Sequence, residues 1–94
     1  MSITPEQYKT IHKAIEVYGV DHQLKLVLEE MAELQKEICK NWRGRDNVDE
    51  IADECADVEI TLAQLKIIFG IEGEVERHRT MKINRLKLRL RNHS

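Results

Sequence analysis

The sequence contains few of the residues that end helices, turn a chain sharply or cross-link it. Its 94 residues include one Pro, four Gly, two Cys and four aromatic side chains. A β-sandwich or β-barrel needs a turn signal about every ten residues, so the scarcity of Pro and Gly argues against both. The two cysteines, Cys39 and Cys55, form no C-x-x-C pair. Because free cysteine is commonly buried, we expect both to be reduced residues of the core.

Long apolar segments are also missing. The longest apolar run covers residues 67–71, whereas a membrane-spanning helix needs about 20 such residues. The first residues, MSITPE, carry neither the basic nor the apolar region of a secretory signal. We therefore expect a cytoplasmic protein that has no membrane partner.

The sequence is rich in charge, and the charge is divided unevenly along the chain. Charged residues make up 34% and hydrophobic residues 41%, yet the net charge is only −2. Residues 1–76 hold all 17 acidic residues and eight basic ones, a net −9, whereas residues 77–94 hold seven basic residues and no acid. The apolar content argues against disorder, and the length predicts one domain over residues 1–94. The division predicts that something charged lies between an acidic body and a basic tail, and it argues against a uniformly basic nucleic-acid binder.

Four amphipathic segments predict an all-α fold. The helices are expected over residues 5–18, 22–42, 48–69 and from about 74 onward. Their predicted caps are Thr4, Asp21 and Asn47, with Gln7 and Glu50 completing capping boxes at the first and third helices. Because the connections are short, we expect a small, compact, antiparallel four-helix bundle. Its apolar faces are wider than one small chain can cover, so we also expect a homodimer or a larger homo-oligomer.

Two of these helices carry acidic pairs beside their apolar stripes. On the second helix Glu30 and Glu33 share a strip with Glu37. On the third, Glu54 and Asp57 lie one turn apart at the edge of the core. Unpaired ions near a core cost on the order of several kcal/mol each, and a divalent cation would neutralise them. Oxygen ligands without Cys or His suit Mg²⁺ or Mn²⁺. The alternative interpretation is an ordinary solvated acidic face.

Residues 29–34 read EEMAEL and residues 50–58 read EIADECADV. Together they resemble the E-x-x-E…E-x-x-D signature of the MazG-like all-α nucleoside triphosphate pyrophosphohydrolases, over about residues 20–90. The resemblance implies the fold of that family and a Mg²⁺-dependent cleavage of a nucleoside triphosphate between its α- and β-phosphates, releasing a monophosphate and pyrophosphate. It also implies catalytic metal ligands at Glu30, Glu33, Glu54 and Asp57.

The last helix is expected to contact the phosphates. The family places a Lys and an Arg there, which fits Lys82 and Arg85, although a second alignment puts Thr80 at the position of the Lys. Which basic residue touches phosphate therefore stays open. Charge that develops on the leaving pyrophosphate would be stabilised by these cations, with Arg89 as a third. Asn84 fits a phosphate or sugar contact and a plain helix surface equally well.

Two further roles have competing candidates. Glu33 and Glu30 are the leading candidates for accepting a proton from the attacking water. Trp42, the only tryptophan, is suited to stacking on a base, but its register with the apolar stripe of the second helix favours packing in the core.

Three other functional classes differ in the residues that they require. A ferritin-like di-iron bundle requires Glu-x-x-His, and none of the four histidines follows a Glu at that spacing. A non-catalytic helical module that binds a nucleotide or a nucleic acid through the basic tail remains an alternative, although the acidic body would repel a duplex. A coiled-coil partner would not need carboxylates at the edge of its core.

Overall fold

The computed structural model describes residues 3–93, and these residues form helices without any strand. The helices are α1 (Pro5–Tyr18), α2 (Val20–Trp42), α3 (Val48–Phe69) and α4 (Glu72–Arg91). The predicted all-α class and the number of helices are therefore confirmed over this part of the chain. None of the described helices is both long and apolar enough to cross a membrane.

The start of α1 follows the sequence prediction closely. The Thr4 hydroxyl accepts a hydrogen bond from the backbone N–H of Gln7, and the Gln7 side chain accepts one from the backbone N–H of Thr4. This reciprocal pair is the predicted capping box. The helix ends at Gly19, whose φ of 92° lies in a region that other residues rarely adopt. Because Gly19 is also the N-cap of α2, the predicted Asp21 cap is wrong, and Asp21 lies inside the first turn of that helix.

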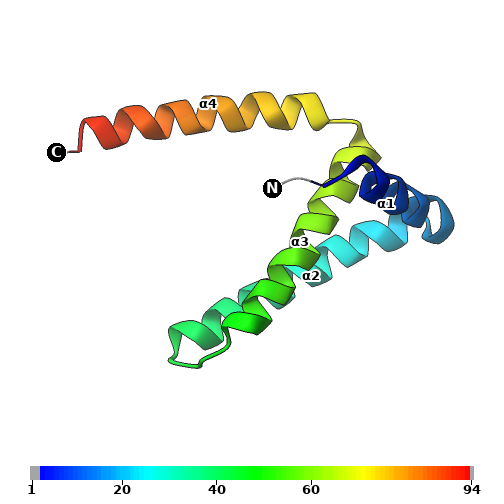
Figure 1. The fold of residues 1–94 in the computed structure, drawn as a ribbon, viewed down its shortest axis with the longest axis horizontal. Helices are drawn as coiled ribbons and strands as arrows, with labels where there is room; N and C mark the ends of the chain where they lie inside the picture. The colour runs from blue at the N-terminus through cyan, green and yellow to red at the C-terminus, as the bar shows by residue number, and fades with distance from the viewer. Residues whose placement is uncertain (1–2, 94) are drawn as a thin grey trace.

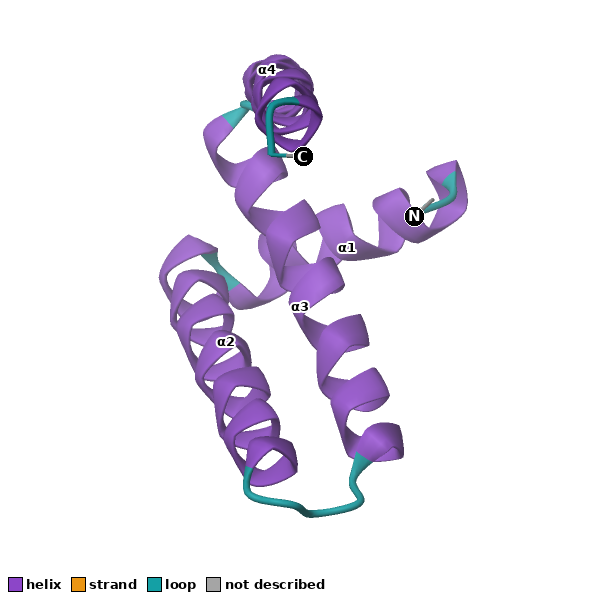
Figure 2. Ribbon diagram, turned by 90° about the vertical axis from the view of Figure 1, so that its left-hand side faces the viewer, coloured by secondary structure: helices purple, strands orange, loops and turns teal. Residues whose placement is uncertain are grey.

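Helices α2 and α3 form an antiparallel hairpin that carries most of the tertiary contacts, and α1 packs across one end of it (Figure 2). The buried apolar side chains are few, namely Ile11, Val27 and Ala63. A buried amide pair accompanies them, in which Gln23 Nε2 donates to Gln64 Oε1 at 3.0 Å. A single copy of the chain thus has a narrow and partly polar core.

Three residues that were expected in the core lie outside it. Cys39 and Cys55 are free, as predicted, but both are exposed. Trp42, at the last position of α2, is 87% exposed, so packing in the core is wrong for this side chain. The helical register did place these residues on or beside the apolar stripes, but a single chain leaves the parts of α2 and α3 that carry them uncovered.

Helix α4 begins at Glu72, two residues earlier than predicted, and includes Gly73. Its first turn is tied to the body through Glu72, whose carboxylate accepts a hydrogen bond from the Tyr8 hydroxyl at 3.3 Å and lies 3.9 Å from Lys66 Nζ. Beyond that turn α4 extends away from the other helices (Figure 1). The expected compact four-helix bundle is therefore wrong for a single chain, because α4 does not pack along the other helices and none of its residues is buried.

Candidate metal centre

Three of the predicted acidic ligands meet between α2 and α3. Glu30 comes from α2, Glu54 and Asp57 come from α3, and one carboxylate oxygen of each lies within 4.8 Å of the others. The i, i+3 spacing of Glu54 and Asp57 places both on one face of α3, and the antiparallel pairing of the hairpin brings Glu30 opposite that face. All three residues are partly buried.

Glu30 is the member of this cluster that holds a proton most readily. Its pKa is raised from 4.5 to about 7 because its side chain hydrogen-bonds to Asp57, because burial disfavours the charged form, and because Asp57, Glu54 and Glu33 repel a further negative charge. Without a cation, Glu30 therefore keeps its proton near neutral pH and donates it to the Asp57 carboxylate.

Glu54 is the member of the cluster with an unmet hydrogen-bonding requirement. Its Oε2 atom is buried and has no hydrogen-bond partner. Burial is the first cause that raises the pKa of Glu54, followed by the negative charges of Asp57 and Asp53. Among residues 3–93, every ion pair involves other acidic residues, such as Lys40 with Glu37 and Lys66 with Glu72. An unpartnered buried oxygen beside two further carboxylates is a donor set that fits a hard divalent cation such as Mg²⁺ or Mn²⁺.

Glu33, the fourth predicted ligand, is not part of the cluster. Its side chain is exposed on the next turn of α2, but its charge still raises the pKa values of both Glu30 and Glu54. The structure thus brings together three of the four predicted ligands and leaves Glu33 at the rim.

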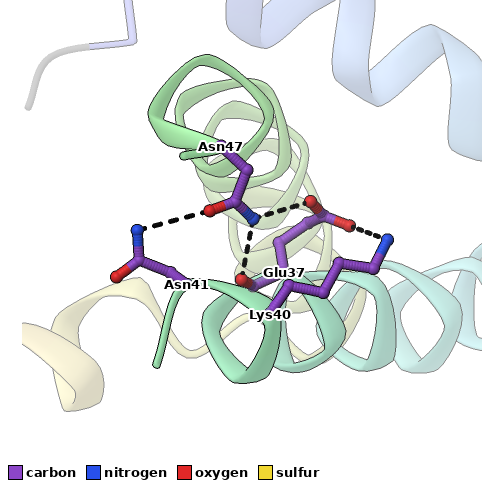
Figure 3. A network of polar contacts seen from close by, with 4 residues as sticks. All are labelled: Glu37, Lys40, Asn41 and Asn47. Carbon is purple, nitrogen blue, oxygen red and sulfur yellow. Dashed lines mark hydrogen bonds and ion pairs between the residues drawn. The ribbon is translucent and has the colours of Figure 1, made fainter. Parts of the chain in front are cut away.

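A polar network that the sequence did not predict closes the hairpin next to this cluster (Figure 3). The Asn47 side-chain amide donates to the backbone oxygen of Glu37 at 2.9 Å and to its Oε1 at 3.0 Å. Lys40 Nζ donates to the second carboxylate oxygen of Glu37 at 3.0 Å, and Asn41 Nδ2 donates to Asn47 Oδ1 at 3.3 Å. The hydrogen bond from Asn47, followed by the one from Lys40, lowers the pKa of Glu37.

This network corrects two sequence interpretations. Asn47 precedes α3 but makes no side-chain cap, so the predicted capping box with Glu50 is wrong. The Oδ1 atom of Asn47, which would accept from a backbone N–H of α3, accepts from Asn41 of α2 instead. Glu37 belongs to the same strip as Glu30 and Glu33, yet it is buried and fully partnered. The only sequence signal was the place of Glu37 and Asn47 on either side of the 43–46 turn.

The predicted substrate-binding residues do not reach the cluster within one chain. Lys82, Asn84, Arg85 and Arg89 are all exposed on α4, which comes close to α3 only next to the turn joining them (Figure 1). Trp42 projects from the far end of α2, beside the 43–46 turn.

No protein-family model, no curated protein and no solved structure matches this chain. What this chain does must therefore be argued from the carboxylate cluster and from the motif that contains it.

Proposed function

We propose that this chain is a MazG-like nucleoside triphosphate pyrophosphohydrolase that requires Mg²⁺, with Mn²⁺ as a substitute. The observation that carries the proposal is the meeting of Glu30, Glu54 and Asp57, none of which forms an ion pair with a basic side chain among residues 3–93. These are three of the four acidic positions of the E-x-x-E…E-x-x-D motif, and they come from both of its halves.

The carboxylates of Glu30, Glu54 and Asp57 are the residues that would hold the cation. A divalent cation bound there supplies positive charge that offsets the charge of a triphosphate and orients its phosphates. The orphaned Oε2 of Glu54 supports this assignment, because a buried carboxylate oxygen is costly unless a donor or a metal partners it. Cation binding would also release the proton that Glu30 holds against Asp57.

Glu33 is the better placed of the two candidates for general base. Glu30 is engaged with Asp57, whereas Glu33 stands at the rim of the cluster with an exposed carboxylate. A water between Glu33 and the α-phosphate would lose its proton to Glu33 as it attacks. Glu33→Gln should then lower kcat while leaving cation binding largely intact.

Lys82, Arg85 and Arg89 are proposed to stabilise the leaving pyrophosphate, with Asn84 beside them and Trp42 available for stacking on the base. All five side chains are exposed, so each is accessible to a ligand or a partner. Because α4 stands apart from the cluster of its own chain, we further propose that the working form is a homo-oligomer.

The decisive assay incubates the protein with a panel of ribo- and deoxyribonucleoside triphosphates and Mg²⁺ and separates the products. We expect a nucleoside monophosphate and pyrophosphate, with the activity abolished in Glu54→Gln and Asp57→Asn. Glu59→Gln removes one carboxylate from an exposed position of the same helix and serves as the control. Orthophosphate release, or equal activity in all variants, would contradict the proposal.

The second candidate is a non-catalytic module that binds nucleotides or nucleic acid through α4. The exposure of all seven basic residues from Arg77 to Arg91 favours it. In that case an oligonucleotide or nucleotide should bind without turnover, the binding should weaken steeply with salt, and Glu54→Gln should leave it unchanged.

A further inference from the structure

Helix α4 has the least tertiary packing of the four helices. None of its residues is buried, and Ile83, Leu86 and Leu90 are 57%, 46% and 64% exposed. Across residues 3–93, the backbone of α4 comes near that of α3 alone. Most helix stability in proteins comes from packing an apolar face, and an isolated helix is marginal in water. The exposed face of α4 therefore requires a surface that its own chain does not offer.

The exposed face of α4 has an apolar strip with a basic edge. At about 100° per residue, Leu86 and Leu90 lie close together around the helix, and Lys82, Arg89 and Arg85 occupy the adjoining arc of about 60°. Lys82, Leu86 and Arg89 line one shallow groove along the helix. A matching surface must offer apolar side chains next to carboxylates.

The body of a second copy offers such a surface, whereas α4 extends away from the body of its own chain (Figure 1). Residues 1–76 carry a net −9, against +7 on residues 77–94. On α3, Ile60 is 43% exposed and lies one helical turn after Asp57, about 60° away around the helix. A nucleic acid would supply phosphates but no apolar face for Leu86. A second copy of this chain supplies both.

We propose that α4 of one copy packs across α2 and α3 of a second copy and places Lys82 and Arg85 beside the second copy's carboxylate cluster. In a two-fold pair the exchange is reciprocal, so each of the two sites takes its carboxylates from one chain and its phosphate-binding cations from the other. This inference rests on the proposed function for the role of those cations, and it makes the site incomplete in a monomer.

A complementation experiment tests the exchange. Glu54→Gln and the double variant Lys82→Ala/Arg85→Ala, each inactive alone, are co-expressed with different affinity tags, and the mixed dimer is purified through both tags. One of its two sites then has intact carboxylates and intact cations, so we expect about half of the wild-type activity. If the cations act within their own chain, both sites of the mixed dimer are damaged and activity stays at background, which would overturn the proposal.

A second readout does not depend on activity. Zero-length carbodiimide coupling of ¹⁵N-labelled with unlabelled protein should join Lys82 of one chain to an acidic residue of α2 or α3 of the other, giving hybrid labelled peptides. Lys82→Arg keeps the charge but removes the amine, and it should abolish this cross-link. Cross-links confined to one chain would refute the exchange. If no nucleotide is hydrolysed but the hybrids form, the proposed function fails while the packing of α4 stands.

The oligomeric state provides a third test of the proposal. Sedimentation should show a dimer or larger assembly that Leu86→Asp dissociates, whereas Leu88→Asp, on the far side of the helix from the apolar strip, should preserve it. Both positions are exposed in the single chain, at 46% and 55%, so neither variant should unfold the body. A wild-type monomer, or a monomer that binds an oligonucleotide through α4, would overturn the proposal.

Discussion

Replacing Glu30 by Gln tests the electrostatics of the cluster directly. Gln has nearly the shape of a protonated Glu and its amide can donate to Asp57, but it cannot ionise. Without a divalent cation, Glu30 has a pKa of about 7 in the folded protein, against 4.5 as the ordinary value. The folded state therefore holds a proton that the unfolded chain has lost, and this contribution to stability disappears as the pH rises through about 7.

The magnitude follows from the difference between the two pKa values. At roughly 1.4 kcal/mol per pKa unit, the interval from 4.5 to about 7 corresponds to at most about 3 kcal/mol. Because Glu30 is partly exposed, solvent screening reduces this to about 1–2 kcal/mol. In a domain of this size, that is a difference in Tm of roughly 4–16 °C.

The assay is thermal or urea unfolding in a chelator, across the range from about pH 5 to about pH 8. Relative to the wild type, Glu30→Gln should gain about 1–2 kcal/mol of unfolding free energy across this range. All other ionisable groups are common to both proteins, so the difference between the two curves isolates Glu30. Glu29→Gln, at the exposed neighbouring position, should run parallel to the wild type. Millimolar Mg²⁺ at about pH 8 should then raise the Tm of the wild type but not that of Glu30→Gln.

Two outcomes would refute this reasoning. If the difference between Glu30→Gln and the wild type is constant with pH, Glu30 does not share a proton with Asp57. If Mg²⁺ stabilises both proteins equally, the cation does not bind at this cluster.

Two further predictions concern the hairpin that holds the cluster. Asn47→Asp removes both hydrogen bonds to Glu37 and places two carboxylates next to each other. It should therefore lower the Tm by roughly 5 °C or more and weaken Mn²⁺ binding measured by calorimetry. Asn92→Asp, at the exposed end of α4, should change neither the Tm nor Mn²⁺ binding. Gln64→Leu leaves the buried Nε2 of Gln23 without its acceptor and should cost about 1–3 kcal/mol in urea unfolding. Adding Gln23→Leu should recover much of that loss, and a cost equal to the sum of the two single variants would contradict this explanation.

Some features of the fold follow from neighbouring residues, whereas others depend on tertiary packing. The capping box at Thr4 and the helix end at Gly19 depend on a few neighbouring residues, so the sequence predicted both. Asn47 carries the same local signal for a cap, but its amide has a better partner in Glu37, ten residues away in sequence and across the turn. Local propensity cannot rank those two partners, because only the packing of the hairpin brings the second one near.

The same distinction between local pattern and tertiary packing applies to the candidate site. Helical periodicity alone placed Glu30, Glu54 and Asp57 at the edges of apolar stripes, because the angle between residues on one helix follows from their spacing. Only the tertiary structure decided that these three meet while Glu33 stays at the rim, since the register between α2 and α3 is set by side-chain packing and by the bonds of Asn47. The course of α4 was likewise beyond the sequence. Its amphipathic pattern requires an apolar partner, but a pattern on one helix does not say where that partner lies, and the body of a single chain turns out not to supply it.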